Sequence, residues 1–155
     1  MPSVWLPAPR YSQSRDGACL PACVRMALAY WGDPRDEAEI ATLLGTRSFG
    51  TPLSNATRLS AWGYNATLAG LSRSALEALL HEGVPVIARV WTPMLDYWPV
   101  DTPHVVLIVG YDEQAVFIND PAFAETTHSV PWDAFLAAWA EFDETVVVIR
   151  PPGSG

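Results

Sequence analysis

The spacing of apolar residues changes once along this chain, near Val84, and that change restricts the fold more than any other feature. Before it, apolar residues recur at helical spacing, and the helical stretches end at glycines such as Gly32 and Gly45. After it, runs rich in β-branched residues are separated by turn residues, as in strands. Helices gathered in one half and strands in the other predict an α+β fold with an antiparallel sheet, because a parallel α/β sheet alternates the two.

The chain is expected to form one domain over residues 1–155, since no linker, repeat or low-complexity tract interrupts it. Residues 1–12 contain three prolines and predict an extended segment, and residues 151–155 predict a disordered tail. The predicted helices cover residues 19–31, 36–44, 52–62, 72–80 and 131–140, and the predicted strands cover residues 65–69, 84–91, 104–109, 115–119 and 145–149.

The charge balance excludes some classes of partner. Nine Lys and Arg residues stand against 17 Asp and Glu residues, which gives a net charge of −8. A chain this acidic has no basic patch to neutralise phosphates, so we expect no nucleic-acid binding, and neutral or basic substrates are favoured. Neither a membrane-spanning apolar run nor a signal peptide is apparent, and we therefore expect no membrane segment and a cytoplasmic protein.

Cys19 begins the first predicted helix. A thiol at a helix start lies near the positive end of the helix dipole, which favours the thiolate, the nucleophilic form of cysteine. The alternative is that Cys19 is a small buried apolar residue. Cys23 lies four residues further on, where a disulfide within a regular helix is geometrically awkward, so both cysteines are expected to be reduced thiols.

Two predicted strands are joined by a turn that we centre on Asp112. Residues then face each other when their numbers sum to 224, which places His104 opposite Asp120. A carboxylate there would hold one imidazole nitrogen and leave the other free to act as a base. A register that differs by one residue would bring Asn119 opposite His104, so Asp120 and Asn119 both remain candidates for the orienting group.

A metal site built from Asp101, His104 and Asp120 would match no standard ligand spacing, and we expect neither a metal nor a cofactor. His81 and His128 have no acidic or cysteine partner at a suggestive spacing and are expected at the surface.

The order Gln13, Cys19, His104, Asp120 resembles that of papain-like cysteine peptidases. It is most similar to the bacteriocin-processing peptidases, which cleave leader peptides after a double glycine, and to their stand-alone relatives. The resemblance runs from about Leu6 to Ile149, and its matching stretches are residues 13–19, 29–32, 50–54, 103–111, 116–122 and 131–135.

This resemblance implies a papain-like fold whose helical half carries Cys19 and whose antiparallel sheet carries His104 and Asp120. It also implies that Cys19 attacks a carbonyl carbon of a peptide or protein substrate while His104 shares the thiol proton. Asp120 would orient His104, and Gln13 would stabilise the oxyanion together with the backbone N–H of Cys19. The aromatic-rich loop over residues 91–103 is expected to wall the substrate cleft.

The chain departs from the family in two ways. Leu20 follows Cys19 where the family usually has glycine, and the best-known members are attached to a membrane transporter that this sequence lacks. A double-glycine specificity is therefore not implied, although a leader or precursor peptide is one candidate substrate. Two other functions stay open: a catalytically silent peptide-binding domain, and a deamidase, transglutaminase or transpeptidase that uses the same residues. The sequence also leaves the oligomeric state open.

Overall fold

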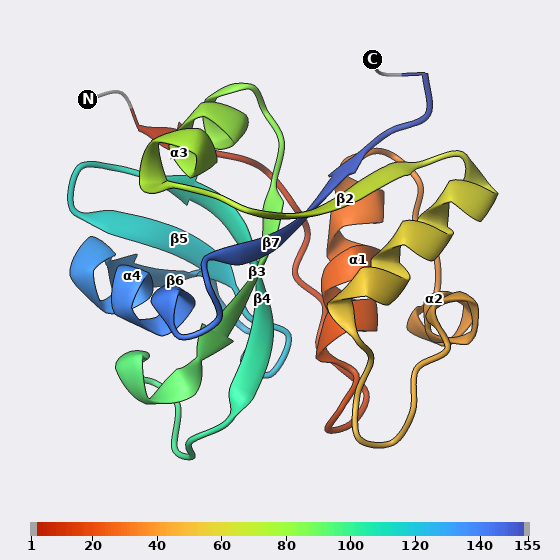
Figure 1. The fold of residues 1–155 in the computed structure, drawn as a ribbon, viewed down its shortest axis with the longest axis horizontal. Coiled ribbons are helices and arrows are strands. Elements are labelled where there is room, and N and C mark those ends of the chain that lie inside the picture. The colour runs from red at the N-terminus through yellow and green to blue at the C-terminus, as the bar shows by residue number, and fades with distance from the viewer. Residues whose placement is uncertain (1–2, 154–155) are drawn as a thin grey trace.

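The computed structural model describes residues 3–153 as a twisted antiparallel sheet with helices on both faces (Figure 1). The sheet has seven strands in the order β2-β7-β3-β4-β5-β6, with β1 paired to β4. Every pairing between these strands is antiparallel, which confirms the predicted α+β class. In chain order the elements are β1 (Val4–Trp5), α1 (Cys19–Tyr30), α2 (Glu37–Leu44), η1 (Leu53–Trp62), β2 (Asn65–Gly70), α3 (Arg73–His81), β3 (Val86–Trp91), η2 (Thr92–Met94), β4 (Pro103–Tyr111), β5 (Ala115–Asn119), β6 (His128–Pro131), α4 (Trp132–Ala140) and β7 (Thr145–Arg150).

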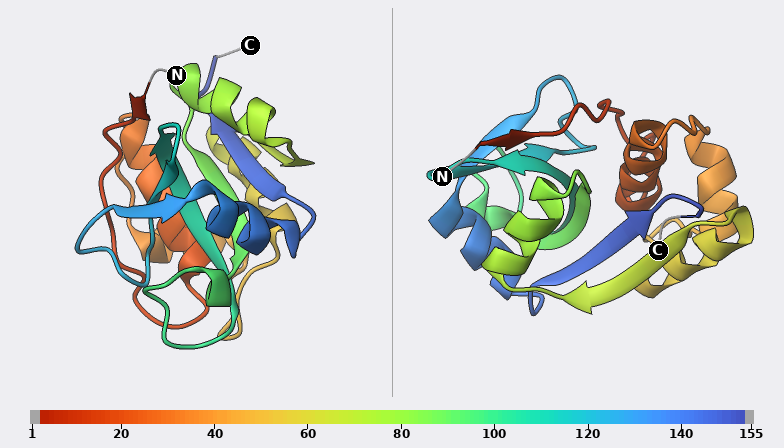
Figure 2. Two further views of the ribbon diagram at one scale, coloured as in Figure 1. Left: turned by 90° about the vertical axis from the view of Figure 1, so that its left-hand side faces the viewer. Right: turned by 90° about the horizontal axis from the view of Figure 1, so that it is seen from above.

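Two apolar cores lie on opposite faces of the sheet. The helices α1, α2 and η1 cover one face, and α3 and α4 cover the other, as the two views in Figure 2 show. Side chains alternate across strand β4, so Val105 and Leu107 join the core of α1 whereas Val106 and Ile108 join the core of α3 and α4. Burial on both faces explains why β4 is an almost continuous apolar run.

Local signals in the sequence position most helix ends. Helix α2 ends at Gly45, which adopts a left-handed φ of 68° that favours glycine. The Ser72 side chain accepts a hydrogen bond from Ala75 N–H at 3.1 Å and caps α3. These ends agree with the predicted ones to within one or two residues.

The helix predicted over residues 52–62 is a 3₁₀ helix, η1, and not an α-helix. Its polar side chains bond to nearby carbonyls: Thr57 Oγ1 donates to Ser54 O at 2.8 Å, and Asn55 Nδ2 donates to Leu44 O at 2.9 Å. The Thr57 bond is local and competes with the regular α-helical pattern, whereas the Asn55 bond joins η1 to the end of α2.

Strands β1 and β6 were not predicted, because each is short and depends on a neighbour. Strand β1 lies within the segment predicted to be extended and pairs with Gly110 and Tyr111 of β4. The first two residues of that segment, and residues 154–155 of the predicted tail, lie outside the described part of the chain. Within residues 3–153, no helix is long and apolar enough to cross a membrane.

The predicted register of the β4–β5 hairpin is wrong. Asp112 N–H donates to Ala115 O at 2.9 Å, so the turn is centred after residue 113 instead of on Asp112. The Asp112 carboxylate stabilises this turn by accepting from Gln114 N–H and Ala115 N–H, both at 2.8 Å. A bulge between Ile108 and Gly110 then shifts the pairing by one residue.

Candidate active site

A cleft of about 580 Å³ opens between the start of α1, which carries Cys19, and the start of β4, which carries His104. Both halves of the chain contribute to its walls. The helical half supplies Gln13, Cys19 and Leu53, and the sheet half supplies Arg89, Trp98 and His104. The expectation that the loop before β4 walls the cleft is confirmed, since Val100, Thr102 and Pro103 also line it.

Cys19 is the first residue of α1 and is half-buried at the cleft, whereas Cys23 is fully buried one helical turn later. The Cys23 thiol donates to Val105 O at 3.4 Å. Burial, together with the nearby charges of Cys19 and Asp120, raises the pKa of Cys23 well above its usual value. Cys23 is therefore an inert thiol that connects α1 to β4, and Cys19 is the accessible one.

His104 lies between a carboxylate and a thiol. Its Nε2 donates to Asp120 Oδ1 at 2.7 Å, and Cys19 interacts with the ring closely enough to raise the pKa of His104. In the observed register, Asp120 lies diagonally across from His104 on the same face of the sheet, and not directly opposite it. Diagonal neighbours are about 7–8 Å apart, a gap that these two side chains can span.

The carboxylate of Asp120 is fully buried and accepts four hydrogen bonds. Oδ1 accepts from His104 and from Ala122 N–H at 2.9 Å. Oδ2 accepts from Tyr97 Oη and from Trp98 Nε1, both at 2.8 Å. Four donors compensate the loss of water around a buried negative charge, so the group can stay ionised and hold His104 in one orientation.

The two shifted pKa values follow from this arrangement. Burial by itself lowers the pKa of His104, but its interactions with Asp120 and Cys19 outweigh burial and raise the pKa to about 9. Burial by itself raises the pKa of the Asp120 carboxyl, but hydrogen bonds from His104, Trp98 and Ala122 hold it below its usual value. Both effects favour an imidazolium beside a carboxylate at neutral pH.

Asn119, the other candidate for the orienting group, is bonded elsewhere. Its Nδ2 donates to Ala8 O at 3.3 Å, and its Oδ1 accepts from Thr127 Oγ1 at 2.6 Å. It belongs to the buried attachment of the N-terminal segment to β5, so Asp120 is the group that contacts His104.

Gln13 lines the same cleft as Cys19. Its backbone N–H donates to Pro121 O at 2.8 Å, which ties this segment to the turn that carries Asp120. Its side-chain Nε2 donates to Arg15 O at 3.0 Å, and Oε1 is buried with no hydrogen-bond partner among the described residues. An amide nitrogen has two N–H donors, so one remains for a bound group.

Two aromatic neighbours of the site, Tyr97 and Trp98, were not predicted individually. Trp98 packs edge-on against His104 at 4.6 Å between ring centroids, and Tyr97 stacks on His128 at 3.9 Å. His128 is half-buried and bonds to Phe123 O, so its predicted surface position is wrong, whereas His81 is exposed. The loop before β4 is rich in aromatic residues, which was the sequence feature that could have drawn attention to them. It did not indicate that two of these residues donate hydrogen bonds to Asp120.

No group of three His, Cys, Asp or Glu side chains within residues 3–153 is placed to hold a metal ion. Asp101 in particular is exposed and does not join His104 and Asp120.

Comparison with known proteins identifies one family and several solved structures with the same fold. The model of the family described as Peptidase_C39 like matches residues 5–147. No curated protein matches the chain. A crystal structure from Bacillus anthracis described as a C39-like peptidase superposes with a TM-score of 0.82 at 18% identity, covering 99% of this chain and 100% of the other.

Two further solved structures share the fold. The peptidase domain of Streptococcus ComA, a bifunctional ABC transporter involved in quorum sensing, gives a TM-score of 0.75 at 16% identity and covers 93% of this chain and 98% of its own. A double-glycine-motif protease from an AMS/PCAT transporter, solved with its leader peptide, gives 0.75 at 18% identity and covers 96% and 94%. These identities are low, so the likeness establishes a shared fold and nothing beyond it.

Proposed function

The chain belongs to the Peptidase_C39-like family, and from that premise we propose that it is a cysteine peptidase whose nucleophile is Cys19. One observation carries the proposal: His104 is hydrogen-bonded to the buried carboxylate of Asp120 and interacts with Cys19, and both Cys19 and His104 line an open cleft. Thiol catalysis needs a nucleophile, a base beside it and a group that orients the base. Cys19, His104 and Asp120 are proposed for these three roles in that order.

The proposed reaction begins with Cys19 and His104 as a thiolate–imidazolium pair. The thiolate attacks the carbonyl carbon of the scissile peptide bond, and the charge that develops on the carbonyl oxygen needs donors. The backbone N–H of Cys19 lies at a helix start, outside the intrahelical pattern, and the spare N–H of Gln13 Nε2 is the second donor that we propose. One such donor is worth about 2.7–4 kcal/mol of transition-state stabilisation in acyl-transfer enzymes.

The remaining steps return the enzyme to its starting state. The imidazolium of His104 gives its proton to the leaving amine as the C–N bond breaks, which leaves an acyl thioester on Cys19. His104 then takes a proton from a water molecule as the water oxygen attacks the thioester carbon. The C–S bond breaks, the acyl product leaves as a carboxylic acid, and the thiolate–imidazolium pair is restored. Asp120 stays ionised and holds the ring throughout.

A peptide substrate is supported by the relative that was solved with a leader peptide in complex. We propose a leader or precursor peptide as the substrate of this chain. The proposal does not extend to a double glycine before the cleavage site, because Leu20 replaces the glycine that usually follows the nucleophile.

Alkylation with iodoacetamide across a range of pH tests the nucleophile. We expect Cys19 to react at least about tenfold faster than Cys23, and the reaction to persist below pH 7, because His104 supports the thiolate. His104→Ala should slow the labelling of Cys19, whereas Cys23→Ala should leave it unchanged. Peptide mapping by mass spectrometry measures each site. Slow labelling at Cys19 that is insensitive to His104 would overturn the proposal.

The masses of the products distinguish a peptidase from a silent peptide-binding domain and from an enzyme that transfers or deamidates. A fluorogenic peptide library digested by the wild type and by Cys19→Ala should yield cleaved peptides with the wild type only. Binding without cleavage would indicate a silent peptide-binding domain. Products that join an added primary amine, or that lose a side-chain amide, would indicate transfer or deamidation.

A further inference from the structure

The loop between α2 and η1, residues 46–51, forms one rim of the cleft and is called the rim loop below. Arg47 N–H donates to Gly50 O at 3.1 Å, and Gly50 N–H donates back to Arg47 O at 3.0 Å. The hydroxyls of Thr46 and Thr51 lie 2.6 Å apart and share a hydrogen bond at the base of the loop. These three bonds close the rim loop into a tight turn that needs no ligand to order it.

The rim loop is held directly against the segment that carries the nucleophile. A Cβ atom at Gly17 would lie 2.6 Å from Ser48 O and 3.1 Å from Gly50 N, and Gly17 has a φ of +85°. Only glycine permits both this backbone conformation and this close approach. The position of the rim loop is therefore set relative to Cys19, two residues after Gly17.

A second hollow, of about 560 Å³, lies on the outer side of the rim loop. Phe49 and Pro52 line both this hollow and the catalytic cleft, so the two share a wall. The Phe49 side chain is 85% exposed, which is the highest value among the exposed large apolar residues within residues 3–153. A substrate that fills the cleft can therefore pass over Phe49 into the hollow.

Two arginines, Arg47 and Arg58, give the hollow its chemistry. Both are exposed, and within residues 3–153 neither side chain has an ion pair, a hydrogen bond or an aromatic ring as partner. The guanidinium of Arg58 lies at Gly45, over the C-terminal end of α2, where the helix dipole favours a cation. Other arginines are engaged, as Arg150 is with Glu82 at 2.8 Å.

Resting on the proposed peptidase function, we propose that Arg47 and Arg58 bind an acidic side chain of the substrate peptide. A guanidinium presents donors in a fork that matches a carboxylate, and two unpaired guanidiniums beside one hollow favour an anionic group. The site selects peptides that carry Glu or Asp a few residues from the scissile bond. The positive charge of Arg47 and Arg58 beside the hollow is opposite in sign to the net charge of the chain, −8. That net charge on its own favours neutral or basic substrates.

A binding measurement tests this site without requiring turnover. The probes are two short fluorescein-labelled peptides of one sequence, one with several Glu residues and the other with Gln at the same positions. Fluorescence anisotropy with the Cys19→Ala protein, at low salt, should show about tenfold tighter binding of the Glu peptide. The difference should shrink as sodium chloride is added, because exposed charges are screened.

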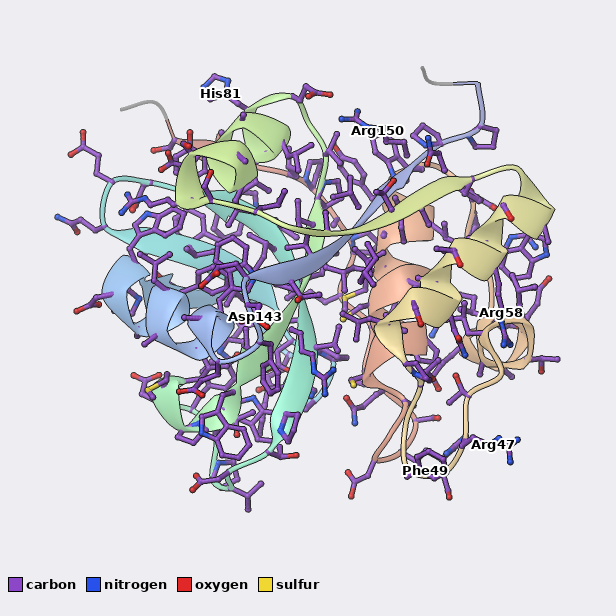
Figure 3. All side chains as sticks on the ribbon, viewed as in Figure 1. Arg47, Phe49, Arg58, His81, Asp143 and Arg150 are labelled. Carbon is purple, nitrogen blue, oxygen red and sulfur yellow. The ribbon has the colours of Figure 1, made fainter. Side chains whose placement is uncertain are left out.

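Matched variants assign the preference to the hollow. Arg47→Ser together with Arg58→Ser should remove the preference for Glu, and Arg58→Lys should retain part of it because the charge remains. The control is Arg150→Ser, which removes the same charge near the opposite edge of the molecule from Arg47 and Phe49 (Figure 3) and should leave the preference intact. A thermal melt of each variant establishes that it is folded.

The proposal is overturned if Glu and Gln peptides bind equally, or if the preference survives in the folded double variant. Stronger competition by inorganic phosphate than by chloride at equal ionic strength would assign the hollow to phosphate instead of a carboxylate. If alkylation of Cys19 is slow and independent of His104, the peptidase proposal is wrong, but a preference for the Glu peptide would still stand. The two proposals can therefore fail separately.

Discussion

At the scale of single residues, Asp120 organises the candidate site. It is fully buried, and its four donors come from the loop before β4, from β4 itself and from the turn after β5. The residue types at Cys19, His104 and Asp120 were predictable, because their order along the chain resembles one family. The contributions of Tyr97 and Trp98 were not predictable, because an aromatic side chain gives no sign in the sequence of which polar atom it will reach.

The raised pKa of His104 is a residue-scale prediction. Asp120→Asn removes the carboxylate that supports the imidazolium, so we expect the pKa of His104 to fall from about 9 and the imidazolium to be depleted at neutral pH. An NMR titration of the His104 ring measures the pKa directly. Asn119→Ser is the matched control, since Asn119 does not contact His104, and it should leave the titration unchanged. Equal pKa values in wild type and Asp120→Asn would show that Asp120 is not the cause.

At the scale of elements, the helices were easier to predict than the pairing of the strands. Gly45 and Ser72 mark helix ends through their own backbone and side-chain preferences, which act locally. The hairpin register depends on the Asp112 carboxylate, which stabilises a different turn, and on a bulge before Gly110. Periodicity does not reveal a bulge, so the predicted register was wrong, although the side chains of His104 and Asp120 do meet diagonally.

Gly110 provides a prediction at the same scale. A Cβ atom there would overlap Val4 O, so strand β1 can approach β4 only because residue 110 is glycine. Gly110→Ala should separate β1 from β4 and lower the free energy of unfolding by about 1–3 kcal/mol, as overpacked sites do. Urea unfolding measures the free energy.

Hydrogen exchange locates the damage in that variant. The amide of Leu6, which donates to Val109 O at 2.7 Å, should exchange faster in Gly110→Ala. The amides that join β4 to β5 should stay protected, because β5 lies along the other edge of β4. Exchange that increases equally throughout the hairpin would contradict this separation.

At the scale of the whole molecule, the sheet holds two halves on either side of one cleft. Phe49 from the helical half and Val100 from the sheet half are both exposed and both line it. Exposed apolar side chains on facing walls favour a substrate with apolar groups at the mouth of the cleft.

Phe49→Ala tests this role of the cleft walls. Phe49 has no role in the proposed chemical steps. We therefore expect KM for cleaved peptides to rise about five- to tenfold with little change in kcat. The free energy of unfolding should hardly change, because the ring is 85% exposed. Steady-state kinetics on the best peptides of the library measure both constants, and a fall in kcat with constant KM would place Phe49 in the chemistry instead.

The sequence by itself determined the α+β class, the helix ends and the chemical identity of the residues at the site, because these depend on local spacing and residue type. Only the tertiary structure decided which atoms meet. The diagonal contact of His104 with Asp120, the donors from Tyr97 and Trp98, and the approach of the rim loop to Gly17 join segments far apart in the chain. Their geometry follows from packing and strand register, which no local pattern encodes.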